Sequence, residues 1–164
     1  MNKKTIHIFN IILVLLSMLT IFLFSSETAD NSSNTSKTLV KEVVSIVVRD
    51  DDVKQEKVES IVTNYMFYIR KSAHFIEFML LGFLFVNIAK DYRHLSIGLV
   101  MFCVLLSCLY AATDEVHQLF VDGRAARVFD VCVDTAGAFI GAMGYYGIYS
   151  IINRQNSTNF DKKV

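Results

Sequence analysis

Apolar residues gather in four long runs that are separated by more polar segments. The runs cover residues 6–24, 72–89, 95–112 and 129–152. As a helix, the first run of roughly 19 residues would be about 28 Å long, close to the hydrocarbon thickness of a bilayer. The second run contains His74 and Glu77, and the fourth contains Asp130 and Asp134. The pattern therefore predicts an all-α integral membrane protein with four transmembrane helices.

The first run precedes Ser25-Ser26-Glu27-Thr28-Ala29, and a signal peptide is the alternative interpretation of it. The apolar core of a signal peptide is usually only about 7–15 residues long and ends at a small-residue cleavage site. The run is longer than that, and the residues after it fit a cleavage site poorly. We therefore expect an uncleaved first span.

Residues 25–70 form the long connection between the first and second runs. Residues 30–36 are rich in Asn and Ser and are expected to form a loop. Apolar residues then recur at helical spacing over 39–47 and 58–69, which predicts two amphipathic helices lying on the membrane or capping the bundle. The acidic residues 50–52 are expected to be a solvated turn at the start of the second helix, because the ligand spacing of a calcium loop is missing.

An even number of spans places both termini on the same side of the membrane. The short flanks on that side carry Lys3, Lys4, Lys90, Arg93, Arg154, Lys162 and Lys163. The opposite flanks carry Arg70, Lys71, Arg124 and Arg127. The positive-inside rule then predicts cytoplasmic termini and an extracytoplasmic, partly helical segment at 25–70.

Composition agrees with a single membrane domain over residues 1–164. The chain is 53% apolar, its mean hydropathy is +0.41, and 16 basic residues balance 16 acidic ones. These values argue against a disordered chain and against nucleic-acid binding. The three cysteines are odd in number and lie in apolar runs, which argues against a disulfide framework or a CxxC zinc site.

Polar residues concentrate in three short stretches, residues 70–77, 114–118 and 127–134, at one end of the predicted bundle. A charge at mid-membrane costs at least about 2.5–3.5 kcal/mol, so such residues usually face a bundle interior. Three stripes at helical spacing contain them: Lys71, His74 and Glu77; Cys103, Ser107, Tyr110, Asp114 and His117; and Arg127, Asp130, Asp134, Gly137 and Gly141.

Small residues on the fourth run indicate its packed face, because they let membrane helices approach closely. Gly137 and Gly141 share their stripe with the two aspartates, which are therefore expected to point into the bundle. Gly144 and Gly147 are expected to serve packing as well, with a helix dimer as the alternative. Glu115 falls off its stripe and is expected to be a surface residue or a partner for Arg124. Residues 122–123 are expected to form a turn.

The chemistry of these stretches suits recognition of an anion. The candidate ligand-binding residues are Lys71, His74, Glu77, Asp114, Glu115, His117, Gln118, Arg124, Arg127, Asp130 and Asp134. Arginine offers bidentate contacts to phosphate or carboxylate, so a pyrophosphate-bearing lipid head group is a sensible ligand. The alternative to a ligand site is a buried charge network with a purely structural role, which fixes the register of the helices.

Acid–base chemistry is also within reach of these side chains. Candidates are His74, Glu77, Asp114 and His117, which provide acid and base groups at neutral pH. The same residues with Asp130 would also surround a divalent metal, but no HExxH-like motif supports this and nearby arginine disfavours a cation. We therefore expect neither a metal nor a cofactor.

These motifs resemble those of the VanZ-like family of small bacterial membrane proteins. The resemblance rests on Phe24-Ser25-Ser26, on Arg70-Lys71-Ser72-Ala73-His74-Phe75-Ile76-Glu77-Phe78 with Leu81-Gly82, on Asp114-Glu115-Val116-His117-Gln118-Leu119-Phe120-Val121, on Gly123-Arg124, and on Asp130 to Asp134 with Gly137 and Gly141. Glu27 and Asp122 depart from the family pattern, which often has glutamine and proline there. The resemblance implies a multi-span protein of the bacterial cell membrane, associated with resistance to the glycopeptide teicoplanin.

Four hypotheses follow for the function. The leading one is an outward-facing site that binds an anionic envelope ligand, with a cell-wall precursor lipid or a glycopeptide antibiotic as partner beside the lipid bilayer. The second is an enzyme that acts by general acid–base catalysis on a lipid-linked head group. A transporter is disfavoured because the first run has no charge and the third none in its cytoplasmic half. The fourth is a scaffold for a cell-wall synthesis enzyme; the oligomeric state stays open.

Overall fold

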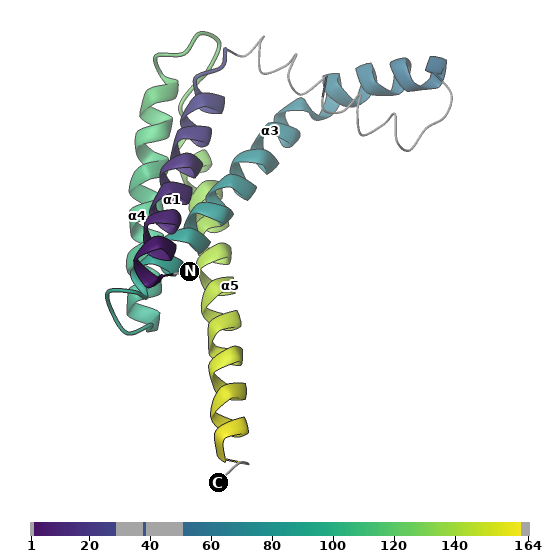
Figure 1. Ribbon diagram of the computed structural model, residues 1–164. Helices are drawn as coiled ribbons and strands as arrows, with labels where there is room; N and C mark the ends of the chain where they lie inside the picture. The colour runs from purple at the N-terminus through teal and green to yellow at the C-terminus, as the bar shows by residue number, and fades with distance from the viewer. Residues whose placement is uncertain (1, 29–37, 39–50, 162–164) are drawn as a thin grey trace.

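The computed structural model describes residues 2–28, 38 and 51–161, without the side chains of 51–67, 69 and 156–161. The helices described over these ranges are α1 (Lys3–Ser25), α3 (Asp51–Ala89), α4 (Ile97–Gln118) and α5 (Val128–Asp161) (Figure 1). The loop expected at 30–36, the apolar pattern at 39–47 and Asp50 lie outside the described residues.

Each of these helices contains a stretch long and apolar enough to cross a membrane. Among the described residues the four stretches are Lys3–Ser25, Arg70–Ala89, Ile97–Gln118 and Val128–Gln155. Within the described residues, the predicted all-α architecture with four helices long and apolar enough to span a membrane is therefore confirmed. The third span was expected from residue 95, but α4 begins at Ile97 because Ser96 is its N-cap and accepts a hydrogen bond from the Leu99 N–H.

α3 joins two features that the sequence pattern separates. The helical pattern at 58–69 and the apolar run at 72–89 lie on one uninterrupted helix, which begins at Asp51. No proline or glycine occurs between residues 51 and 81, so nothing in the backbone ends the helix between the two patterns. Figure 1 shows the first turns of α3 extending away from the other helices.

α3 and α5 form the most extensive helix pair in the fold, and glycine lets their backbones touch. A Cβ atom on Gly137 would overlap the Phe75 carbonyl, and one on Gly141 would overlap the Met79 carbonyl. Across the pair, a Cβ on Gly82 would overlap the carbonyl of Ala138. The expected packing role of Gly137 and Gly141 is confirmed.

Gly144 and Gly147 behave differently from their two neighbours on α5. A Cβ atom at either position would have no heavy atom within 4 Å, so neither glycine packs against another described helix. The expectation that all four glycines serve packing is wrong for these two. Both glycines lie on a face of α5 turned away from the bundle, because Tyr145 and Tyr146 beside them still pack against the core cluster of Val86 and Leu95. Beyond these residues α5 extends past the bundle toward its C-terminal end (Figure 1).

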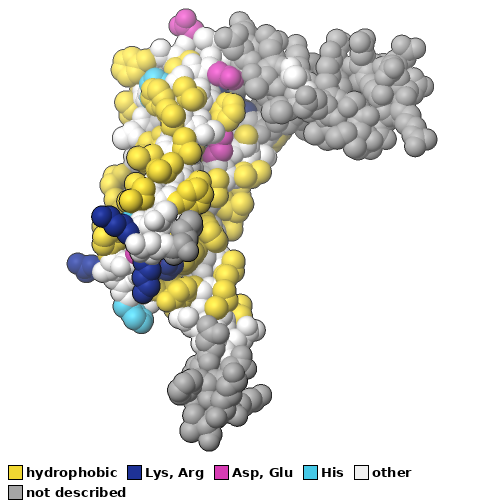
Figure 2. Space-filling view, viewed as in Figure 1, with side chains coloured by type: hydrophobic (Ala, Val, Ile, Leu, Met, Phe, Trp, Pro, Cys, Tyr) yellow, Lys and Arg dark blue, Asp and Glu magenta, His cyan; other side chains and the backbone are white. Residues whose placement is uncertain are grey.

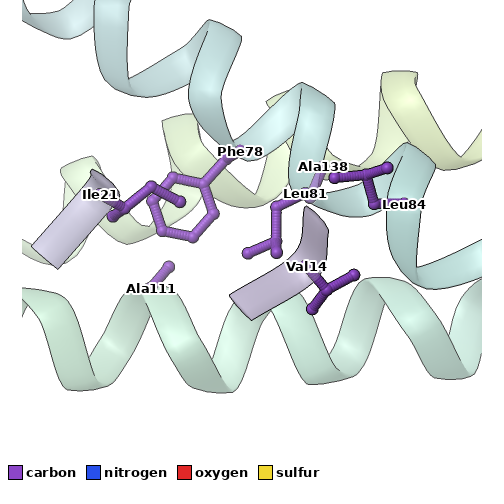
Figure 3. Packing of buried hydrophobic residues seen from close by; sticks show 7 residues of the cluster. All are labelled: Val14, Ile21, Phe78, Leu81, Leu84, Ala111 and Ala138. Carbon is purple, nitrogen blue, oxygen red and sulfur yellow. The ribbon is translucent and has the colours of Figure 1, made fainter. Parts of the chain in front are cut away.

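A small apolar core lies where the four helices meet (Figure 3). It is formed by Val14, Ile21, Phe78, Leu81, Leu84, Ala111 and Ala138. The ring of Phe78 is fully buried and lies within the core between α1 and α4, which fixes the depth of α3 in the bundle. The outer face of α1 stays apolar and exposed, with Leu15 and Leu23 more than half exposed, as suits contact with lipid.

Candidate functional site

A cavity of about 120 Å³ lies at the end of the bundle where the α3 span begins, α4 ends and α5 begins. Eight of the candidate residues line it: Lys71, His74, Glu115, Gln118, Arg124, Arg127, Asp130 and Asp134. Arg70, Gly123 and Ala125 complete the wall. Residues from three separate stretches of the sequence therefore meet around one space.

Two carboxylates of α5 enter this cavity as their stripe predicts. Asp130 is 5% exposed and Asp134 is 3% exposed. Lys71 of α3 forms an ion pair with Asp130, and its positive charge also acts on Asp134. The stripe that carries both aspartates also carries the glycines of the α3–α5 contact, so close packing of the backbones brings the carboxylates to the α3 lysine.

The connection between α4 and α5 closes the cavity. Gly123 adopts a left-handed conformation with φ of 74°, which a side chain would disfavour, and the expected turn at 122–123 is confirmed. The backbone N–H of Arg127 donates a 2.8 Å hydrogen bond to the carboxylate of Glu115. Glu115 is 5% exposed, so its expected surface location is wrong. Glu115 is buried because its carboxylate is turned toward the backbone N–H of Arg127, the residue just before α5.

His74 lies on the α3 wall of the cavity beside Glu77. The imidazole is 7% exposed, and its Nδ1 atom is 3.7 Å from the Oε2 atom of Glu77. Among the described residues, neither of these two atoms has a hydrogen-bond partner. Glu77 itself does not line the cavity. The pair therefore presents one buried histidine to the cavity, with a carboxylate just behind it.

A second polar layer lies between α4 and the C-terminal end of α1. The hydroxyl of Ser25 and the side-chain amide of Gln118 each donate a 2.9 Å hydrogen bond to the same oxygen of Asp114. The hydroxyl of Ser26 is 3.0 Å from Nε2 of His117, and the ring of Phe22 stacks on the imidazole at 4.5 Å. Asp114 and His117 thus contact α1, and neither lines the cavity. His74 and Asp134 share the cavity, whereas His117 does not.

Arg124 connects the two layers. Its guanidinium donates hydrogen bonds to the carbonyl oxygens of Phe24 (3.0 Å) and Glu27 (2.8 Å), and it also lines the cavity. Burial, followed by the positive charge of Arg70, lowers the pKa of Arg124 from its ordinary value. Two guanidinium groups are thus held close enough to repel each other, and an anion between them would relieve that repulsion.

Three residues of the site have no role in the sequence interpretation. Ser25 and Ser26 follow an apolar run and look like ordinary helix-end residues, although the first is fully buried against Asp114. Arg70 is not among the candidate ligand-binding residues of that interpretation, yet it lines the cavity. The available signal was that all three belong to the motifs that carry the family resemblance.

The arrangement suits anion recognition and proton transfer. Arginine and lysine side chains surround a small space that also contains a buried histidine. Within the described ranges, no group of three or more His, Cys, Asp or Glu side chains is placed to hold one metal ion.

Comparison with known proteins gives a single clear relationship. No curated protein and no solved structure matches the chain. The family model VanZ/LLP1 matches residues 9–152, which includes all four spans in large part and every residue of the cavity. With this match over most of its length, the chain belongs to the VanZ/LLP1 family, as a multi-pass membrane protein of that family.

Proposed function

We propose that this VanZ/LLP1 protein lies in a bacterial cell membrane and binds an anionic envelope ligand in the cavity between α3, α4 and α5. The ligand class is a pyrophosphate-bearing lipid head group. Binding would alter access to cell-wall precursors and so reduce susceptibility to teicoplanin, or serve maintenance of the envelope. The observation that carries this proposal is the meeting of Arg70, Lys71, Arg124 and Arg127 around one small cavity.

Charge within the cavity supports an anionic ligand. Its wall carries four basic and three acidic side chains, the latter being Glu115, Asp130 and Asp134. Asp130 is engaged by Lys71, and Glu115 accepts the Arg127 backbone N–H. Two of the three acidic groups thus have internal partners and Asp134 lies in the field of Lys71, while the guanidinium of Arg70 acts repulsively on Arg124. A phosphate group would supply the missing negative charge.

The membrane orientation is part of the same proposal. The bundle end opposite the cavity carries Lys3, Lys4, Lys90, Arg93 and Arg154 within the described residues. A basic flank faces the cytoplasm in most membrane proteins. We therefore place the termini in the cytoplasm, segment 25–70 outside, and the cavity at the outer leaflet, where lipid-linked precursors are exposed to glycopeptides.

Binding is tested with purified full-length protein and polyprenyl pyrophosphate as the probe, with the unphosphorylated polyprenol as the matched lipid. We expect retention of the pyrophosphate lipid alone in native mass spectrometry. Arg127→Gln removes an exposed cationic side chain from the cavity wall and should weaken retention at least about tenfold, as for a lost charged contact. Lys4→Gln removes an equal charge at the other end and should change nothing. Equal retention by all three proteins would contradict the proposal.

The cellular role is tested by minimum inhibitory concentrations of teicoplanin in a susceptible host. Expression of the chain should raise the concentration, and Arg127→Gln should abolish that rise at equal protein level. Alanine variants of His74 and His117 provide a second test, because both imidazoles lie in the polar layers. Unchanged resistance in those variants at normal protein levels would remove the site from this phenotype.

An enzyme acting on a lipid-linked head group is the second candidate, and the placement of His74 favours it. A buried imidazole beside the Glu77 carboxylate is a plausible general base, with arginine to stabilise developing charge. Incubation with polyprenyl pyrophosphate should then yield a product of changed mass. His74→Gln should retain binding and lose turnover, whereas recovery of unchanged lipid from the unmodified protein would exclude this candidate.

A further inference from the structure

A second polar surface lies at the opposite end of the bundle from the cavity. A groove of about 640 Å³ runs between the α3–α4 connection and the C-terminal half of α5. Lys90, Arg93 and His94 line it from the connection, while Tyr146, Tyr149 and Asn153 line it from α5. Figure 2 shows Lys and Arg side chains gathered at this end, next to the apolar belt of the helices.

This end of the molecule is strongly basic. Within the described segments 2–10, 86–100 and 143–155, five lysines and arginines face a single acidic residue, Asp91. The Asp91 carboxylate is already occupied, because Lys90 Nζ lies 2.7 Å from it and His7 Nδ1 lies 3.1 Å from it. Arg93 and His94 are both exposed and have no side-chain hydrogen bond or ion pair among the described residues. The charge of Arg93 and the hydrogen-bonding capacity of both side chains are therefore available at the surface.

The neighbourhood of Arg93 and His94 is amphiphilic. The same two residues line an adjoining cavity of about 510 Å³, whose other walls include Leu99 and Phe102. Phe102 is 55% exposed on the apolar surface of α4. The Arg93 guanidinium and the His94 imidazole therefore adjoin an apolar face, and tyrosines line the same groove, which suits the usual location of tyrosine at a membrane interface.

We propose that this groove binds the head group of an anionic phospholipid, with Arg93 and His94 on the phosphate and an acyl chain along Leu99 and Phe102. The tyrosine hydroxyls and the Asn153 amide would donate to the glycerol or phosphate oxygens. Phosphate is the shared recognition chemistry, and the apolar wall beneath the cations argues for a lipid as its source. Basic pockets between membrane helices bind anionic lipids in this manner.

The test uses full-length protein in detergent, titrated with phosphatidylglycerol and observed by native mass spectrometry. The unmodified protein should retain phosphatidylglycerol and not the zwitterionic phosphatidylcholine. Arg93→Gln should raise the Kd for phosphatidylglycerol about fivefold, which is the contribution of one basic side chain near an anionic surface. Arg93→Lys preserves the charge and should stay within about twofold of the unmodified protein.

Lys4→Gln is the matched control, because Lys4 has the same charge at the same end but lines none of these cavities. Its Kd should be unchanged. An equal loss in Lys4→Gln and Arg93→Gln would show attraction by net charge alone and overturn the site. Displacement of the lipid by inorganic phosphate would overturn the choice of a lipid, because a free anion has no use for the apolar wall. Arg93 is exposed, so these variants do not disturb the core.

Discussion

The hydroxyl of Ser25, the last residue of α1, donates a 2.9 Å hydrogen bond to the carboxylate of Asp114 near the end of α4. Both side chains are buried, at 0% and 4% exposure. Together with the 2.7 Å hydrogen bond from the Tyr110 hydroxyl to the Met18 carbonyl, this polar contact sets the depth of α1 against α4. The contact thereby links α1 to the end of α4 that carries the polar residues of the candidate site.

Removal of that hydroxyl should destabilise the bundle. Ser25→Ala leaves Asp114 with Gln118 as its remaining side-chain donor, and a buried acceptor that loses a donor costs about 1–3 kcal/mol. The free energy of unfolding in mixed micelles measures this. Thr20→Ala is the control, because the exposed Thr20 hydroxyl donates only to the Leu16 carbonyl of its own helix. An equal effect of both substitutions would contradict a special role for Ser25.

The four glycines of α5 should separate into two pairs. Gly141→Ala places a Cβ atom on the Met79 carbonyl, so the α3–α5 backbones must separate, at a cost of about 1–3 kcal/mol. Gly144→Ala meets open space and should be neutral or stabilising by up to about 1 kcal/mol. The unfolding free energies of the two variants test this. A damaging Gly144→Ala would instead indicate a second chain against α5.

The ion pair of Lys71 and Asp130 should behave as a buried pair. Asp130→Asn removes the carboxylate paired with Lys71, leaves the more distant charges of Glu115 and Asp134 to act on the lysine, and should cost up to about 3 kcal/mol of unfolding free energy. The double variant Lys71→Met, Asp130→Asn removes both charges and should be more stable than Asp130→Asn alone. A double-mutant cycle measures the coupling. Additive losses would mean that the two side chains act independently.

Membrane orientation can be tested at the two connections between spans. An alkaline phosphatase reporter fused after Asp122, beside the cavity, should be active because that connection lies outside. The same reporter fused after Asp91, in the basic α3–α4 connection, should be inactive. The reverse pattern would place the cavity at the cytoplasmic leaflet and overturn the proposed access to exposed cell-wall precursors.

The carboxyl of Asp91 should titrate below its ordinary value of 3.8. The hydrogen bond from Lys90 lowers the pKa of Asp91, with a further contribution from His7. Because the folded pKa is depressed, the stabilisation is present above the unfolded pKa and is lost as pH falls through the folded pKa. Carboxyl carbon NMR in micelles measures the titration. Lys90→Gln should move the pKa of Asp91 back toward 3.8, and no movement would remove Lys90 as the cause.

The spans and the polar end of the bundle are predictable because both are periodic signals. An apolar run of bilayer length specifies a span, and Gly137 and Gly141 on the stripe of Asp130 and Asp134 specify which face is packed. The meeting of Lys71 with Asp130 follows from these two facts. The end of a span is less well specified, as the merging of two patterns into α3 shows.

The division of the polar residues between cavity and α1 was not predictable. Asp114 and Glu115 are adjacent, so their side chains diverge by about 100° around α4. The first contacts Ser25 of α1, and the second contacts the Arg127 backbone N–H at the cavity. The spacing of residues within α4 does not specify which helix or loop packs on each side of α4, because that depends on the tertiary structure. For the same reason the hydrogen bond from Ser25 to Asp114 could not be predicted without the position of α1 in the fold.

The backbone contacts between α3 and α5 make one wall of the cavity more rigid than the other. α3 and α5 are in backbone contact at Gly82, Gly137 and Gly141, so we expect the two helices to move as one rigid unit. Such a unit would keep Lys71 and Asp130 together. The opposite wall, residues 119–127, is held by two hydrogen bonds from the Arg124 guanidinium and one from the Arg127 N–H. Entry and release of the proposed ligand would therefore require movement of this loop. Homologues that bind a larger ligand should differ in the length of the loop and keep the α3–α5 contact unchanged.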